Sequence, residues 1–73
     1  MKYALIGCGR IAVNHIKAVV RNGLELTAVC DLVPEHIDSL FEKTGYEGQP
    51  DRYTDYRRML DEHPELELAA IAT

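Results

Sequence analysis

The stretch Ala4-Leu5-Ile6-Gly7-Cys8-Gly9-Arg10-Ile11-Ala12 decides the fold of this 73-residue chain. It contains a glycine motif that follows a short apolar, strand-like run and opens a helix-like segment. A short glycine motif alone is a weak signal, but between a strand and a helix it is typical of dinucleotide-binding folds. Gly7 allows a tight turn out of the first strand, because a residue without Cβ tolerates backbone angles closed to others. Gly9 leaves room for a pyrophosphate, and Ala12 lets the next helix pack closely on the sheet. The motif therefore predicts a dinucleotide site.

An acidic residue marks the expected ribose contact. Asp31 closes the second apolar run, nineteen residues after Ala12, where its carboxylate can accept hydrogen bonds from the ribose hydroxyls. Leu32, the next residue, is expected to contact the cofactor beside it. A carboxylate at this position repels a 2′-phosphate, and residues 32–35 contain no Arg or Lys, although Arg52 could approach from another loop. NAD is therefore favoured over NADP.

Hydrophobic periodicity and turn residues predict alternating strands and helices along the whole chain. The expected strands cover residues 3–6, 24–30, 52–53 and 66–72, and the expected helices cover residues 10–22 and 34–44 and a segment from a Thr54 or Asp55 cap to His63. Right-handed crossovers place such strands in a parallel sheet, most simply in the order 3-2-1-4. The predicted fold class is α/β, a Rossmann-type β-α-β-α-β-α-β unit.

Several expected contacts converge on the carboxyl edge of this sheet, where phosphates bind in such folds. The N–H groups of Arg10 and Ile11 at the helix start are expected to face the phosphates, aided by the helix dipole, and the Arg10 side chain can add a contact. Thr73 ends the fourth strand at the same edge as Gly7 and Asp31, so it is expected near the ribose or phosphates.

Composition excludes several other classes of protein. The net charge is −4, with acidic residues spread along the chain, so nucleic-acid binding is not expected. No segment approaches 18 consecutive apolar residues and no signal-like leader is found, which favours a cytoplasmic location without membrane association. Cys8 and Cys30 are expected to be reduced thiols, because they form no CxxC pair and the cytosol disfavours disulfides. No metal site is predicted.

Other polar and aromatic residues have simpler interpretations. His15 is expected to pack at the rim of the first helix, while His36 and His63 are expected at the surface, remote from the strand ends. Tyr53 and Tyr56 could form a platform for a base, but packing is the favoured interpretation. On the third helix, Tyr56, Met59, Leu60 and His63 are expected to share one face.

The chain resembles the N-terminal part of the glucose-fructose oxidoreductase, inositol dehydrogenase and MocA family over all 73 residues. The resemblance is carried by four stretches: residues 4–12 with His15 and Ala18, Ala28-Val29-Cys30-Asp31, Tyr53-Thr54-Asp55-Tyr56, and Ala70-Ile71-Ala72-Thr73. It implies NAD(P)-dependent hydride transfer with a sugar, an inositol or a related hydroxy compound. It also implies a C-terminal α+β domain that forms the substrate pocket and the interface of a homo-oligomer.

The chain is expected to be one part of such an enzyme. The family's catalytic lysine lies in a Glu-Lys-Pro motif, which is absent, so no catalytic residue is assigned within residues 1–73. Residues 1–73 are therefore interpreted as an incomplete dinucleotide-binding domain, without catalysis and marginally stable by themselves because the fourth strand lacks a neighbour. Two alternatives stay open: a non-catalytic module that senses a dinucleotide, and an interaction module that binds none.

Overall fold

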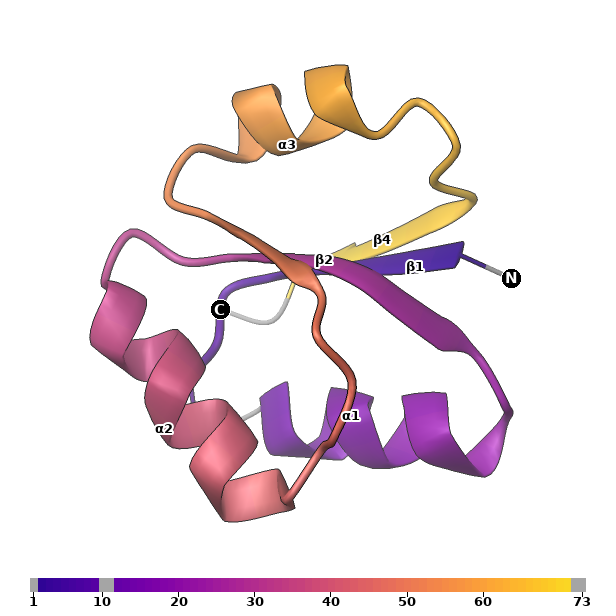
Figure 1. Cartoon of the computed structure of the whole chain (residues 1–73), viewed down its shortest axis with the longest axis vertical. Helices are drawn as coiled ribbons and strands as arrows, with labels where there is room; N and C mark the ends of the chain where they lie inside the picture. Colours follow the sequence, from indigo (N-terminus) through magenta and orange to yellow (C-terminus); the bar gives the residue numbers. More distant parts are fainter. Residues whose placement is uncertain (1, 10–11, 72–73) are drawn as a thin grey trace.

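A parallel sheet with helices on both faces forms the molecule, and the computed structural model describes residues 2–9 and 12–71 of it. The strands are β1 (Lys2–Ile6), β2 (Glu25–Cys30), β3 (Asp51–Tyr53) and β4 (Leu68–Ile71), in the order β3-β2-β1-β4. Helices α1 (Ala12–Arg21) and α2 (Pro34–Thr44) cover one face, and the shorter α3 (Tyr56–Glu62) lies across the other (Figure 1). The predicted strand order and fold class are confirmed.

The ends of the helices follow from local sequence. Gly23 and Gly45 both have positive φ, 65° and 66°, and end α1 and α2 in the left-handed conformation that favours glycine. Pro34 opens α2, as its fixed φ allows. Asp55 caps α3, because its side chain accepts a hydrogen bond from the Arg57 amide at 2.9 Å. The expected bounds of α2 are confirmed, and the other expected bounds that fall on described residues differ from the observed ones by at most two residues.

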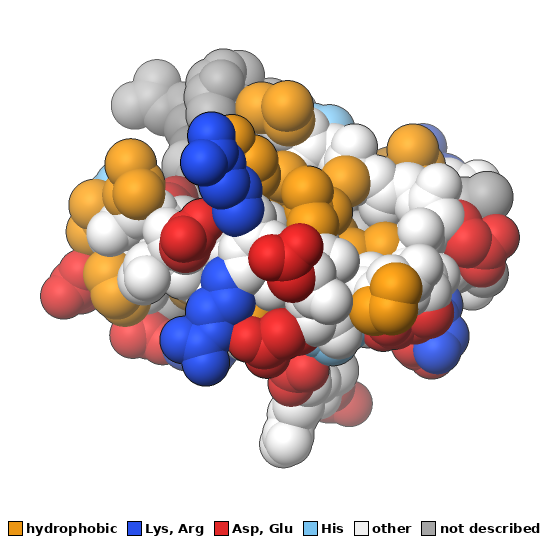
Figure 2. Space-filling view, turned by 90° about the horizontal axis from the view of Figure 1, so that it is seen from above, with side chains coloured by type: hydrophobic (Ala, Val, Ile, Leu, Met, Phe, Trp, Pro, Cys, Tyr) orange, Lys and Arg blue, Asp and Glu red, His pale blue; other side chains and the backbone are white. Residues whose placement is uncertain are grey.

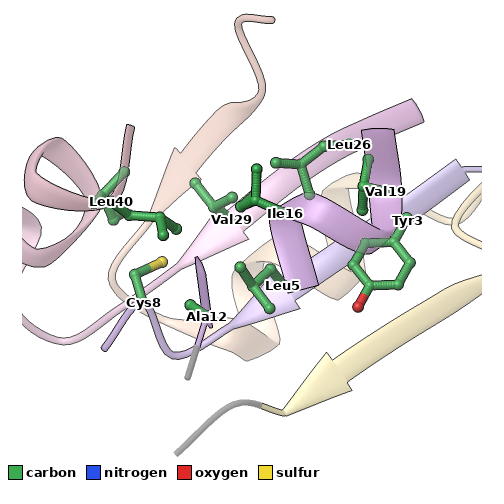
Figure 3. Packing of buried hydrophobic residues seen from close by; sticks show 10 residues of the cluster. Tyr3, Leu5, Cys8, Ala12, Ile16, Val19, Leu26, Val29 and Leu40 are labelled. Atoms are coloured by element: carbon green, nitrogen blue, oxygen red, sulfur yellow. The ribbon is translucent and has the colours of Figure 1, made fainter. Parts of the chain in front are cut away.

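The main core lies between the sheet and helices α1 and α2. Its buried side chains come from β1, the turn after β1, β2 and both helices, and Figure 3 labels most of them: Tyr3, Leu5, Cys8, Ala12, Ile16, Val19, Leu26, Val29 and Leu40. Ile37 of α2 belongs to the same cluster. Together they remove the apolar stripe of each helix from water, the dominant favourable contribution to folding. Val20 of α1 lies outside this core and is 65% exposed.

The opposite face of the sheet is covered more thinly. Met59 of α3 is fully buried against Ala4, Ala28 and Cys30, whose small side chains leave room for one long residue. Of the residues that were expected to share one face of α3, Tyr56 and Leu60 are 47% and 43% exposed, so Met59 is the buried residue of this helix. A helix of seven residues makes about two turns, so it presents few side chains to the sheet. No helix in the described part of the chain is long and apolar enough to cross a membrane.

His63, which ends α3, is largely buried between two carboxylates, and the prediction of a surface histidine is wrong. Its side chain is 11% exposed; Nδ1 lies 2.7 Å from Glu65 Oε2, and Nε2 lies 3.0 Å from Asp51 Oδ2. The hydrogen bond with Glu65 raises the pKa of His63; burial opposes this, but the two carboxylate charges add to the rise. The ring thus connects the start of β3 to the segment after α3.

This histidine is expected to make stability depend on pH. Because the folded pKa is raised, the stabilisation is fully present below the unfolded pKa of about 6.5 and is lost as pH rises through the folded value. The melting temperature of wild type minus that of His63→Gln should therefore be larger at pH 5.5 than at pH 8.5. Thermal unfolding followed by circular dichroism measures this difference, and equal values at both pH values would contradict the assignment.

Candidate dinucleotide-binding site

The turn after β1 has the backbone that its glycines predicted. Gly7 has a φ of 91°, which residues with a Cβ rarely adopt. Its amide donates a hydrogen bond of 2.7 Å to the Cys30 carbonyl at the end of β2. The Asp31 amide in turn donates to the Tyr53 carbonyl at the end of β3, at 3.0 Å. The carboxyl ends of three neighbouring strands are thereby joined at one edge of the sheet.

Gly9 is the open point of this turn. It is exposed, and no described residue accepts a hydrogen bond from its amide. A Cβ added at Gly9 would meet no described atom within 4 Å, so empty space lies above the backbone here. The Gly9 carbonyl accepts from the Ala12 amide at 3.0 Å, which joins the turn to the start of α1. A bare amide beside a helix start can bind an anion such as a phosphate.

Asp31 lies directly beside the glycine turn. Its Oδ2 accepts a hydrogen bond of 2.7 Å from the Cys8 amide, and its Oδ1 accepts one of 2.8 Å from the Val33 amide. Burial of the side chain, which is 11% exposed, opposes ionisation, but the hydrogen bonds from Val33, Cys8 and His36 outweigh it and lower the pKa of Asp31. The group is a carboxylate at neutral pH.

A hydrophobic hollow of about 560 Å³ opens next to this carboxylate. Its lining comes from the ends of β1, β2 and β3 and from the start of α3: Ile6, Gly7, Cys30, Asp31, Leu32, Thr54, Asp55 and Tyr56. Leu32 is 86% exposed and Tyr56 is 47% exposed. In Figure 2, the view from the α3 side, hydrophobic side chains lie exposed among charged ones. A hollow with an apolar lining of this kind suits an aromatic ring such as a nucleobase.

The two cysteines of this region are free and buried. Burial raises the pKa of Cys8 to about 12, and the nearby Asp31 carboxylate contributes to the rise. Burial raises the pKa of Cys30 as well. Since the thiolate is the reactive form, neither side chain is suited to act as a nucleophile near neutral pH.

The predicted site residues fall into two groups. Gly7, Gly9, Asp31 and Leu32 lie together around the turn and the hollow. Arg10, Ile11 and Thr73 lie outside the described residues, so their predicted contacts stay predictions. Within residues 2–9 and 12–71, no cluster of three or more His, Cys, Asp or Glu side chains is arranged to hold a metal ion.

Sequence reasoning missed other residues at this edge. Thr54 and Asp55 line the hollow and were given no binding role. Tyr56 lines it as well and is 47% exposed, so packing, the favoured interpretation of this residue over a platform for a base, is wrong. These residues directly follow β3. In parallel α/β sheets ligands bind at the carboxyl ends of the strands, so this rule could have identified them from the sequence. His36 was expected to be remote from the strand ends, which is also wrong, because its ring contacts Asp31.

The residues present fit a dinucleotide. An open backbone amide, a carboxylate that is ionised and an apolar hollow adjoin one another, as phosphate, ribose and base would require.

Solved structures of known proteins are similar to the whole chain. The WlbA dehydrogenase from Chromobacterium violaceum, solved in complex with NADH and UDP-GlcNAcA, is 31% identical to this chain with a TM-score of 0.81. An oxidoreductase from Agrobacterium radiobacter, solved in complex with NAD⁺, L-tartaric acid and magnesium, is 32% identical with a TM-score of 0.80. Scyllo-inositol dehydrogenase from Lactobacillus casei shares the fold at 20% identity and a TM-score of 0.74. Each match covers 100% of this chain but only 20–21% of the other protein.

No curated protein sequence matches the chain significantly. The model of one protein family matches residues 1–73 in full, and its description is an oxidoreductase family with an NAD-binding Rossmann fold. With the glycine turn, the strand order and the carboxylate at the end of β2, this match shows that the chain belongs to the glucose-fructose oxidoreductase, inositol dehydrogenase and MocA family.

Proposed function

We propose that this chain is the NAD-binding portion of an oxidoreductase that transfers hydride between nicotinamide and a hydroxyl carbon of a sugar-like compound. The observation that carries the proposal is the ionised Asp31 carboxylate beside the open Gly9 backbone. A sugar-like substrate is supported by the WlbA dehydrogenase structure, which contains a sugar nucleotide with NADH. The chain spans about a fifth of that protein, so the activity belongs to the whole protein.

Each part of the cofactor has proposed partners in the chain. Gly7, Gly9, Arg10 and Ile11 are assigned to the pyrophosphate. Asp31 is assigned to the adenosine ribose, where its charge disfavours a 2′-phosphate and so favours NAD over NADP. The adenine is assigned to the hollow, against Leu32, Thr54 and Tyr56. Thr73 is assigned to the ribose and phosphate region. The bound nicotinamide supplies the hydride chemistry, and this chain holds the cofactor for it.

Catalytic residues are assigned to the rest of the protein. Lys2, Lys17 and Lys43 are the only lysines of the chain, and none precedes a proline as the family's catalytic lysine does. We place the substrate pocket in a C-terminal domain, which also forms the interface of a homo-oligomer, and we place the protein in the cytoplasm.

A pair of glycine variants tests the pyrophosphate assignment. Gly9→Ala should keep the wild-type melting temperature, because the added Cβ meets open space, yet bind NADH about tenfold more weakly, because the methyl group displaces a phosphate from a charge-assisted hydrogen bond. Gly7→Ala should instead lower the free energy of unfolding by about 1–3 kcal/mol, because alanine is strained at a φ of 91°.

Both variants are measured in the protein that carries this chain, by thermal unfolding and by calorimetric titration with NADH. Wild-type affinity in Gly9→Ala would contradict the assignment of the pyrophosphate to this turn. Absence of NADH binding to the folded wild-type protein would overturn the proposed function itself.

A further inference from the structure

A groove of about 420 Å³ lies between α1 and the end of α2. Three apolar residues and three cations line it: Val13, Ile16, Val20, Lys17, Arg21 and Lys43. Val20 is 65% exposed, and the three cations are exposed as well. In the described part of the chain none of these cations forms an ion pair, whereas Arg52 and Arg58 do. This surface, the basic groove, therefore combines exposed apolar area with positive charge that no described carboxylate neutralises.

The chemistry of the basic groove defines the partner that it fits. Apolar side chains gain by burying Val20, and carboxylates gain by meeting the cations around it. An extended anionic surface, such as a membrane or a nucleic acid, is disfavoured because the chain as a whole carries a net charge of −4. A short acidic protein segment with exposed apolar side chains covers the groove without meeting that repulsion.

The chain itself contains a segment of this kind. Residues 60–68, the acidic segment, run from the end of α3 to the start of β4 and contain four acids, three leucines and no Lys or Arg. Leu60 and Leu68 are 43% and 47% exposed, and Asp61 and Glu67 are exposed as well. Figure 2, the view from the α3 side, shows carboxylates beside exposed hydrophobic side chains. The acidic segment thus complements the basic groove in both charge and apolar character.

One molecule cannot bring these two surfaces together. Helices α1 and α2 cover one face of the sheet, whereas the acidic segment follows α3, which lies across the other face (Figure 1). We propose that the basic groove binds the acidic segment of a second copy of this chain. The contact is head-to-tail, because each copy offers two different surfaces, and such contacts continue into a ring or an open chain of copies.

This contact is independent of the cofactor assignment. None of the residues of the basic groove or of the acidic segment lines the hollow beside Asp31. Binding of NADH and association of copies are therefore expected to be separable, and each can be tested without the other.

Sedimentation of the whole protein that carries this chain tests the association itself. A head-to-tail contact should raise the average mass with concentration over about a hundredfold range, beyond any closed symmetric oligomer. Added salt should reduce this rise, because it screens the charges. A mass that stays constant over the whole range at low salt would overturn the proposal.

Two double variants test which surfaces meet. The groove variant carries Lys17→Glu with Arg21→Glu, and the segment variant carries Asp61→Asn with Glu67→Gln. Each should stay folded, because the replaced side chains are exposed, and thermal unfolding checks this. Each alone should associate about tenfold more weakly than wild type. Association as tight as in wild type in either variant would overturn the proposal.

A mixture of the two variants provides the sharpest result. The groove variant keeps its acidic segment, and the segment variant keeps its basic groove, so together they should associate with nearly wild-type affinity. Fluorescence anisotropy of the labelled groove variant, titrated with the segment variant, measures this. The matched control is titration with unlabelled groove variant, which reports any exchange of subunits within a symmetric oligomer. A mixture that binds no better than this control would overturn the proposal and indicate a different partner for the groove.

Discussion

Asp31→Ala is expected to weaken NADH binding about a hundredfold, because it removes two hydrogen bonds from ribose hydroxyls to a charged acceptor. NADPH should lose less affinity, since the same substitution removes repulsion of its 2′-phosphate. The two cofactors should therefore bind with similar affinity. Calorimetric titrations of wild type and variant at pH 7.5, where the low pKa of Asp31 keeps it ionised, measure this result.

A second substitution separates charge from structure. Asp31 also accepts hydrogen bonds from the Cys8 and Val33 amides, so alanine leaves these two amides without their partner. Asp31→Asn retains an acceptor oxygen for the Cys8 amide but carries no charge. It should keep a melting temperature closer to wild type and still lose selectivity against NADPH. An unchanged ratio of NADH to NADPH affinity in both variants would show that the ribose binds elsewhere.

Met59→Ala is expected to lower the free energy of unfolding by about 2–5 kcal/mol, the range for truncating a buried long side chain. Met59 is the buried residue through which α3 packs on Ala4 and Ala28, so the variant leaves a cavity where the sheet has a thin cover. The same helix begins with Tyr56 at the hollow. Loss of its anchor should therefore also weaken NADH binding. Urea unfolding and calorimetry measure the two effects.

The matched control for this variant is Met59→Leu. Leucine has nearly the same volume, and such an exchange usually costs less than about 1.5 kcal/mol. It should retain most of the stability and the wild-type affinity for NADH. Equal stability of Met59→Ala and wild type would mean that the packing of Met59 on the sheet contributes little to the free energy of unfolding.

The order of elements was accessible to sequence reasoning because its signals are local. Glycine at positive φ, proline at a helix start and a side-chain cap act within a few residues, and helices here end at Gly23 and Gly45 and begin at Pro34 and after Asp55. Once strands and helices alternate, the handedness of the crossovers leaves few arrangements of the sheet. The glycine turn and the acid after β2 follow from the same short-range patterns.

The surroundings of the glycine turn and of Asp31 depend on contacts between distant parts of the chain. Short-range sequence patterns such as hydrophobic periodicity contain no information on these contacts. Asp31 receives the Cys8 amide from 23 residues away, and its other side meets His36. Tyr56 is 47% exposed at the hollow, whereas Met59 of the same helix is buried in a cluster with Ala4 and Ala28. The sequence by itself thus determined the fold, the glycine turn and the acid beside it. Only the tertiary structure decided which groups bond that acid and which side chains border it, because packing between elements depends on the size and position of every neighbour.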